Sequence, residues 1–242
     1  MNSMLENIRI VLVRTYHAGN IGSAIRAMKT MGLTELVLVN PRDYPSEEAN
    51  KMASSAEDLL EHTKVVDSLY EAVKDCELVI ACTARPRTFD LPVIDPEQSA
   101  TQLMKIAATK PVALVFGPER MGLHNDDIQL AHYRVTIPAN PDYSSLNLAS
   151  AVQILCYELR KQMDNPVEPE VARTFPSIEQ KENFYETLEV LLNDVEFVNK
   201  QHPGQLMLKL RRFFSRAEMD ESELNILRGS LAAVQRKLVS KT

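Results

Sequence analysis

Four of the chain's seven glycines lie in two short segments that each follow an expected strand. Gly19 and Gly22 come after the first strand, and Gly117 and Gly122 come after the fifth. Glycine lets a backbone approach a ligand closely or adopt a positive φ angle. In open α/β sheets, ligands bind at the edge where the parallel strands end. Each glycine alone could be an ordinary turn residue, but four of them at one edge favour a ligand site.

The common nucleotide-binding patterns do not fit these segments. Residues 19–22 read G-x-x-G rather than G-x-G-x-x-G, and the second strand ends in Asn40-Pro41 with no acidic residue for a ribose. No G-x-x-x-x-G-K-[ST] segment occurs. Sites of the NAD or ATP type are therefore disfavoured.

Composition narrows the class of protein. The three cysteines and five histidines show no metal-ligand spacing, so we expect no metal site and no disulfide framework. With no signal peptide and no run long enough to cross a membrane, a cytoplasmic location is expected. The net charge of −6 argues against a general nucleic-acid coat but leaves room for a local basic surface.

Apolar runs alternate with helix-like stretches over the first two thirds of the chain. The expected strands lie at 8–13, 36–39, 63–66, 77–82, 112–116 and 134–137. The expected helices lie at 21–31, 46–61, 67–75, 95–108, 124–131 and 146–163. This order predicts an α/β fold with a mostly parallel sheet and helices on both faces. In the last helix the apolar stripe at Leu146, Ala149, Val152 (or Gln153), Cys156 and Leu159 indicates packing rather than ligand binding.

Three parts follow from this pattern: a domain at 1–163, a linker at 164–176 and a small helical domain at 177–242. The linker carries three prolines and shows no periodicity. Ser177 and Gln180 predict a capping box at the start of a helix reaching about residue 199, and further helices are expected at 205–215 and 221–239. Residues 200–242 hold nine Lys or Arg against four Asp or Glu, so this tail is locally basic.

Three segments together resemble the motifs of the SPOUT methyltransferases. Residues 20–26 read NIGSAIR, residues 116–123 read FGPERMGL, and 137–138 (IP) precede YSSLNLA at 143–149. The resemblance covers residues 5–163 and implies a C-terminal trefoil knot. It is closest to the enzymes that methylate the ribose 2′-hydroxyl of cytidine or uridine at position 32 of the tRNA anticodon loop. Pro118 departs from the arginine expected there, which removes one basic group and one backbone donor.

The resemblance also implies a cofactor, S-adenosylmethionine, and a set of roles. The implied cofactor-binding residues are Cys82, Thr83, Ala84, Gly117, Ile137, Ser144, Ser145 and Leu146. The implied catalytic residues are Arg26, Asn20 and Ser145. The implied RNA-binding residues are Arg14, Arg85, Arg87, Glu119, Arg120, Asn147, Arg211 and Arg212. Arginine is a poor general base, so electrostatic orientation of the target ribose and phosphate is the expected role of Arg26.

Other interpretations stay open at this point. Arg26 could be a solvated helix arginine, Ser145 could be the N-cap of the last helix, and Glu119 could brace loops or pair with Arg120. The family resemblance implies a homodimer that shares an RNA site, with tRNA as partner and with much of the last helix as the dimer contact. A ribosomal RNA 2′-O-methyltransferase, a knotted enzyme acting on a base nitrogen and a non-catalytic RNA-binding protein of the same fold are the alternative functions.

Overall fold

The computed structural model describes residues 3–83, 91–164, 174–198 and 206–239. Contacts within the chain divide it into two units, Met1–Glu170 and Val171–Thr242. The first unit contains the sheet, and the second contains helices. Each unit is described by itself.

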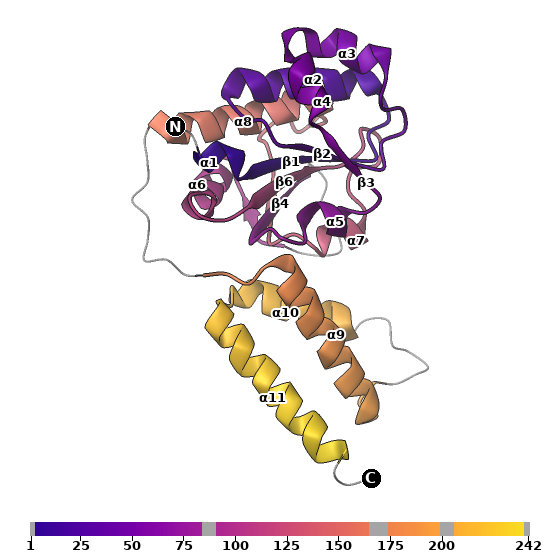
Figure 1. The fold of residues 1–242 in the computed structure, drawn as a ribbon, viewed down its shortest axis with the longest axis vertical. Coiled ribbons are helices and arrows are strands. Elements are labelled where there is room, and N and C mark those ends of the chain that lie inside the picture. The colour runs from indigo at the N-terminus through magenta and orange to yellow at the C-terminus, as the bar shows by residue number, and fades with distance from the viewer. Residues whose placement is uncertain (1–2, 84–90, 165–173, 199–205, 240–242) are drawn as a thin grey trace. The chain divides into compact units, whose positions relative to one another are not determined.

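In the part of the chain that the structure describes, the sheet has seven strands in the order β3-β2-β1-β6-β4-β7-β5, and every pairing is parallel (Figure 1). The strands are β1 (Ile8–Val13), β2 (Leu36–Val39), β3 (Lys64–Val66), β4 (Leu78–Cys82), β5 (Val93–Ile94), β6 (Val112–Phe116) and β7 (Tyr133–Val135). The central strands are apolar on both faces, and all residues of β2 and β6 are buried. This is the pattern of a parallel sheet covered on both sides.

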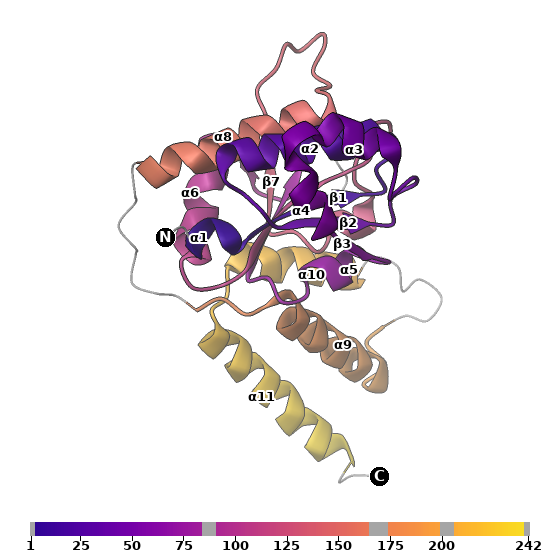
Figure 2. The same ribbon diagram turned by 45° about the horizontal axis from the view of Figure 1, so that its top comes forward.

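Helices cover both faces of this sheet. Figures 1 and 2 show α2, α3 and α8 along one face and α5 and α7 across the other. The helices of the first unit are α1 (Ser3–Glu6), α2 (Ala18–Met31), α3 (Glu47–Ala53), η1 (Ser54–Ala56), α4 (Glu57–Glu61), α5 (Leu69–Val73), α6 (Pro96–Ala107), α7 (Asn125–Ile128) and α8 (Leu148–Asp164). The predicted α/β class with helices on both faces is confirmed, and the trefoil knot stays a prediction from the resemblance.

Several predicted elements differ in detail. The expected helix at 46–61 is interrupted at Ser54, whose φ of 52° takes the chain out of helical geometry. The short elements α1 and β5 were not predicted, since four and two residues carry too little periodicity to be recognised. The last predicted strand extends from Tyr133 to Val135 rather than over 134–137.

Gly19 and Gly22 are helix residues and do not lie in a turn at the edge of the sheet. Helix α2 begins at Ala18, so both glycines lie inside it and are buried. A Cβ atom at Gly22 would lie 2.1 Å from the carbonyl oxygen of Ala49, and one at Gly19 would lie 2.7 Å from a carboxylate oxygen of Glu48. These glycines therefore let α2 pack closely against α3, whereas Gly32 takes the left-handed position after α2, with φ 85°.

Helix α8 packs into its own subunit. Val152, Leu155, Cys156 and Leu159 are all buried in the main hydrophobic core. The packing interpretation of this stripe is confirmed for Val152, Cys156 and Leu159. These side chains are covered without a second subunit, so any dimer contact must use other residues.

The second unit consists of α9 (Ile178–Asp194), α10 (Leu206–Ala217) and α11 (Glu221–Val239) in its described residues. Its small core contains Phe184, Tyr185, Met219 and Leu224. The predicted capping box at Ser177 is present, with the Ser177 hydroxyl accepting from the amide of Gln180 and the Gln180 side chain accepting from the amide of Ser177.

Candidate active site

Three neighbouring strands end together at one edge of the sheet. Strand β4 lies between β6 and β7, and Cys82 at its end is level with both Phe116 and Val135. The segments that begin at Thr83, Gly117 and Thr136 therefore leave the sheet side by side. Segments as far apart in sequence as Thr83 and Thr136, 53 residues, meet here because parallel strands share one carboxyl edge.

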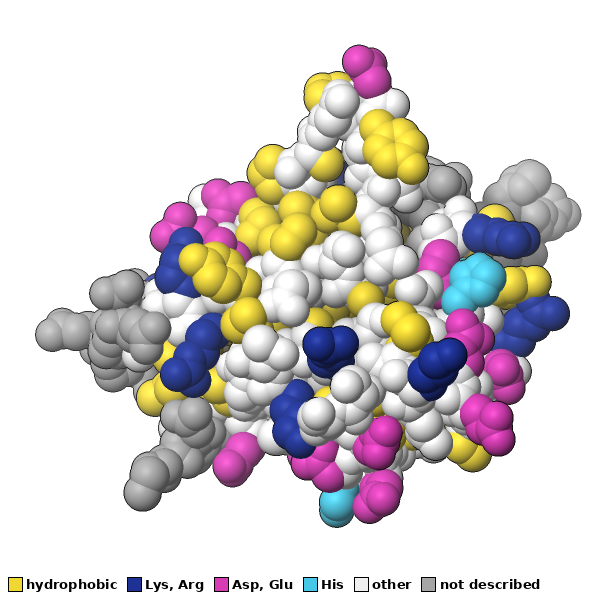
Figure 3. Space-filling view, turned by 90° about the horizontal axis from the view of Figure 1, so that it is seen from above, with side chains coloured by type: hydrophobic (Ala, Val, Ile, Leu, Met, Phe, Trp, Pro, Cys, Tyr) yellow, Lys and Arg dark blue, Asp and Glu magenta, His cyan; other side chains and the backbone are white. Residues whose placement is uncertain are grey.

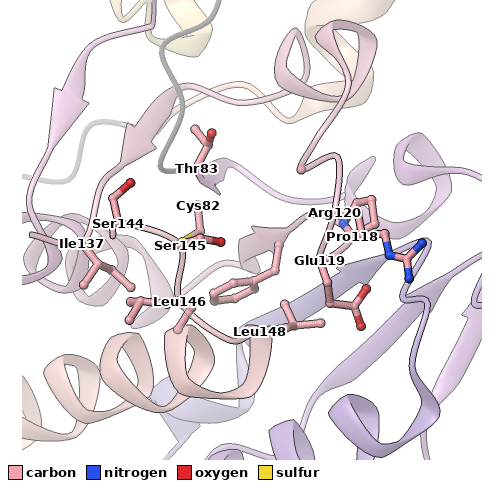
Figure 4. Close-up of a pocket in the computed structure, with 14 residues that line it drawn as sticks. Cys82, Thr83, Pro118, Glu119, Arg120, Ile137, Ser144, Ser145, Leu146 and Leu148 are labelled. Carbon is pink, nitrogen blue, oxygen red and sulfur yellow. The ribbon is translucent and has the colours of Figure 1, made fainter. Parts of the chain in front are cut away.

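A pocket opens between these segments (Figure 4). Its cavity volume is about 120 Å³, and the pocket is open to solvent. Its lining residues are Cys82, Thr83, Phe116, Gly117, Pro118, Glu119, Arg120, Gly122, Ile137, Ser144, Ser145, Leu146, Leu148 and Ala151. The structure thus brings together every predicted cofactor-binding residue except Ala84, which lies outside the described residues.

The turn after β6 depends on its glycines. A Cβ atom at Gly117 would lie 2.3 Å from the amide nitrogen of Leu123 and 2.5 Å from the carbonyl carbon of Gly122. Gly122 itself has a φ of 65°, and its amide donates to the carbonyl of Pro118 at 2.9 Å. The segment therefore doubles back on Gly117 so closely that no side chain fits at that position.

The segments after β4 and β7 are tied to each other beneath the pocket. The Thr83 amide donates to the Val135 carbonyl at 3.1 Å, and the Thr136 hydroxyl donates to the Thr83 carbonyl at 3.1 Å. Burial raises the pKa of the Cys82 thiol to about 12, so this side chain is a neutral thiol near pH 7. Cys82 therefore shapes the pocket wall and is not a thiolate nucleophile.

Glu119 joins the turn after β6 to the start of α2. Its carboxylate accepts from the amide of Tyr16 at 3.0 Å, from the amide of His17 at 3.1 Å and from the side-chain nitrogen of Asn20 at 2.7 Å. Partial burial would raise its pKa, but these hydrogen bonds outweigh that effect and hold the pKa below its usual value. The contacts favour the bracing interpretation of Glu119.

Asn147 connects this network to α8. Its side-chain nitrogen donates to the side-chain oxygen of Asn20 at 3.0 Å. Its own side-chain oxygen accepts from the amides of Ala149 at 2.9 Å and Ser150 at 3.3 Å, which caps α8. The N-cap of this helix is thus Asn147 and not Ser145, which leaves the Ser145 side chain on the pocket wall (Figure 4).

Arg26 does not line the pocket of its own chain. It lies on α2 with an exposed side chain, whereas Ile21, Ala24, Ile25 and Met28 of the same helix are buried. Asn20 also lies outside the lining but contacts Glu119, which belongs to it. The predicted catalytic set is therefore split between the pocket wall, its border and an exposed helix face.

The predicted RNA-binding arginines have varied surroundings. Arg14 forms an ion pair with Asp127, one of whose two contacts is 3.3 Å long. Arg120 lines the pocket, and its guanidinium carbon lies 4.8 Å from the ring centre of Tyr16. In the second unit, Arg211 pairs with Glu182 at 2.5 and 2.8 Å.

The other three predicted RNA-binding residues are Arg85, Arg87 and Arg212. Arg212 follows Arg211 on α10, in the unit that is described apart from the pocket. Arg85 and Arg87 lie outside the described residues.

Four residues of the pocket wall were not among the predicted site residues: Phe116, Pro118, Leu148 and Ala151. Phe116, Pro118 and Leu148 each lie next to a predicted site residue in the sequence. Phe116 ends the buried strand β6, and Leu148 and Ala151 lie in the first turn of α8. In the sequence all three look like core residues, so the pattern alone could not assign them to a pocket.

Two further observations concern other kinds of site. Within the described ranges, no group of three or more His, Cys, Asp or Glu side chains is arranged to hold a metal ion. No helix in the described part of the chain is both long and apolar enough to cross a membrane.

Known proteins match both units. The model of the SpoU rRNA Methylase family matches residues 7–157, and the model of the tRNA methyltransferase TrmJ C-terminal domain matches residues 179–242. The tRNA (cytidine/uridine-2′-O-)-methyltransferase TrmJ of Yersinia pestis is 49% identical over 97% of this chain and 93% of its own length. The TrmJ of Salmonella typhimurium is 48% identical over 97% of this chain and 98% of its own length.

A solved structure agrees with these matches. The crystal structure of TrmJ from Z. mobilis superposes with a TM-score of 0.82 at 35% identity, covering 94% of this chain and 98% of that one. The family models, the relatives and the solved structure thus agree with one another on the family of this chain. The chain belongs to the SpoU methylase family of methyltransferases, in the group of the TrmJ enzymes.

Proposed function

We propose that this protein uses S-adenosylmethionine to methylate a ribose 2′-hydroxyl of tRNA, on cytidine or uridine at position 32 of the anticodon loop. The observation that carries the proposal is the single pocket formed by the segments after β4, β6 and β7. The relatives with that substrate in their names match almost the whole chain, including the helical second unit. A cytoplasmic location follows as part of the same proposal, since tRNA is the substrate.

The pocket wall fits a nucleoside-bearing cofactor in its chemistry. Ile137, Leu146 and Leu148 supply apolar surface for the faces of an adenine (Figure 4). Ser144 and Ser145 supply hydroxyls, and the bare backbone at Gly117 lets peptide groups reach a ligand edge. When bound, S-adenosylmethionine would supply the methyl group as part of a sulfonium.

The chain's own residues would position the RNA and lower the barrier to proton loss. Asn20 donates to the Glu119 carboxylate and accepts from Asn147, so hydrogen bonds connect three segments around the pocket. Ser145 stands on the wall, where its hydroxyl could contact the reacting ribose. Arg26 carries a permanent charge, so its role is to orient the target phosphate and favour ionisation of the hydroxyl rather than to act as a base.

The exposed position of Arg26 supports a shared site in a homodimer. Since Arg26 does not line its own pocket, we propose that it approaches the pocket of a second subunit. Large hydrophobic side chains on and before α8 are exposed, with Tyr143 81% and Tyr157 52% accessible. On the side covered by α2, α3 and α8, hydrophobic side chains gather in one area among scattered charges (Figure 3). Exposed apolar surface of this kind is typical of subunit contacts.

Ribosomal RNA methylation is the second candidate, because the matching family model carries that description. The match of the second unit to the TrmJ C-terminal domain favours tRNA. A non-catalytic role is disfavoured, since the relatives that match this chain over nearly its full length are named as methyltransferases.

The test is methyl transfer from tritiated S-adenosylmethionine to purified tRNA and ribosomal RNA, followed by mapping of the modified nucleotide by mass spectrometry. We expect transfer to tRNA alone, at the anticodon loop. Arg26→Ala should abolish transfer while calorimetry shows unchanged cofactor binding. Lys29→Ala, one turn along the same helix, removes a charge that already contacts Asp58 and serves as control. Full activity in Arg26→Ala would overturn the role of Arg26, and transfer to ribosomal RNA alone would overturn the substrate.

A further inference from the structure

Two arginines lie over the ring of Tyr16, one from the segment after β2 and one from the segment after β6. Tyr16 follows β1, and the sheet order places β1 between β2 and β6. Arg42, which follows β2, has its guanidinium carbon 4.0 Å from the Tyr16 ring centre. Arg120, which follows β6, lies 4.8 Å from the same centre. We call these three residues the Tyr16 cluster.

Backbone contacts hold the cluster beside the pocket. The amide of Arg42 donates to the carbonyl of Thr15 at 3.1 Å, which fixes the second loop against the first. The amide of Tyr16 donates to Glu119, a residue of the pocket wall. Arg120 is itself a lining residue. The cluster is therefore an extension of the pocket border and not a separate surface feature.

The stacked arrangement suits Arg42 to binding a phosphate. A guanidinium that packs its flat face on an aromatic ring keeps its N–H donors in the plane, directed outward. Arg42 is exposed, Tyr16 is 37% accessible, and within the described residues Arg42 forms no ion pair with an acidic side chain. The ring thus limits the rotamers of Arg42 while leaving its hydrogen-bonding edge available.

The two guanidinium groups of the cluster lie against the same ring. Two guanidinium cations that share one ring repel each other. The carboxylate of Glu119 accepts from Asn20 and from the amides of Tyr16 and His17. An anion placed against Arg42 would relieve this repulsion. The repeating anion of an RNA strand is the phosphodiester.

We propose that Arg42, oriented by Tyr16, binds a backbone phosphate of the RNA substrate next to the target nucleotide. This proposal rests on the proposed function, because it takes RNA as the substrate of the adjoining pocket. It assigns Arg42 and Tyr16 to RNA binding, with Arg42 making the contact and Tyr16 acting as a positioning residue. A phosphate contact sets the register of the strand without reading its sequence.

The experiment measures tRNA affinity of the full-length protein by fluorescence anisotropy over a series of salt concentrations. For Arg42→Ala we expect about five- to twentyfold weaker binding, and a slope of log K against log salt that is smaller in magnitude by about 0.7–1. The KM for tRNA should rise with little change in kcat. Lys74→Ala is the matched control, because exposed Lys74 lies between α5 and β4, towards the opposite edge of the sheet.

Two variants of Tyr16 separate stacking from charge alone. Tyr16→Phe keeps the ring and should bind tRNA as the wild type does. Tyr16→Leu removes it and should weaken binding severalfold, while cofactor affinity and the melting temperature report whether the pocket and the fold remain intact.

The proposal fails if Arg42→Ala keeps both the wild-type affinity and the wild-type salt slope. It also fails in its Tyr16 part if Tyr16→Leu is folded and binds as tightly as Tyr16→Phe. If the wild-type protein itself binds and methylates no RNA, the proposed function is wrong, which is a different outcome from a variant that matches an active wild type.

Discussion

Replacing Gly117 by alanine tests whether the turn after β6 shapes the cofactor pocket. The added Cβ atom would lie 2.3 Å from the amide nitrogen of Leu123 and 2.5 Å from the carbonyl carbon of Gly122. Both contacts are to backbone, so no side-chain rotation can relieve them. The turn must open, and the peptide groups that face the pocket must move with it.

The expected loss of cofactor affinity follows from the two close backbone contacts. Overpacking a well-packed site costs about 1–3 kcal/mol. If the turn shifts to relieve the contacts, the pocket changes shape and the cost reduces ligand affinity. Each ~1.4 kcal/mol corresponds to a tenfold change in the dissociation constant. We therefore expect S-adenosylmethionine to bind about 10- to 100-fold more weakly to Gly117→Ala, with a smaller fall in melting temperature than the full cost would produce.

Isothermal titration calorimetry measures the cofactor affinity, and differential scanning calorimetry measures the melting temperature of the same samples. Cofactor binding within twofold of the wild type, together with an unchanged melting temperature, would refute the steric argument. A large loss of melting temperature with intact cofactor binding would show instead that the turn supports the fold and not the pocket.

Three further predictions concern other parts of the first and second units. Gly22→Ala places a Cβ atom 2.1 Å from the carbonyl oxygen of Ala49, so it should lower the free energy of unfolding by about 1–3 kcal/mol in denaturant titration; wild-type stability would contradict the close packing of α2 on α3. Gly229→Ala lies within α11 with no atom within 4 Å of the new Cβ, so it should raise helix stability by about 0.5–1 kcal/mol in the same assay, and a decrease would mean that α11 has a partner there. The pKa of Glu119 is held below its usual value, so its charge stabilises the fold above the unfolded-state pKa of about 4.3 and this stabilisation is lost as pH falls through the lower folded-state pKa. The melting temperature of Glu119→Gln should accordingly lie furthest below that of the wild type near neutral pH and approach it in acid, and a gap that does not depend on pH would contradict a role for the charge.

Much of the fold could be predicted from local patterns in the chain. Buried parallel strands read as continuous apolar runs, and the structure places β1, β2 and β6 at the residues predicted. The left-handed Gly32 and the capping box at Ser177 were also readable, because each depends on residues within a few positions of one another. The ligand edge of the sheet was predicted for a similar reason, since Gly117 directly follows β6 and Gly122 lies in the same short segment.

Other features depend on contacts that no local pattern contains. Gly19 and Gly22 have the spacing of a ligand loop, yet they are helix residues whose missing side chains admit α3, a helix more than twenty residues away in sequence. Glu119 could have been an RNA ligand, a partner of Arg120 or a brace, and only its distances to Tyr16, His17 and Asn20 favour the brace.

The sequence by itself determined which residues have side chains suited to binding a cofactor or RNA, and which strands end near them. The tertiary structure decided which of these residues share a wall, which are occupied by internal partners, and that Arg42 and Arg120 share the ring of Tyr16. The physical reason is the parallel sheet, whose strand order β2-β1-β6-β4-β7 brings distant loops to one edge. Strand order arises from the packing of the whole domain, so it cannot be read from the residues of any one loop.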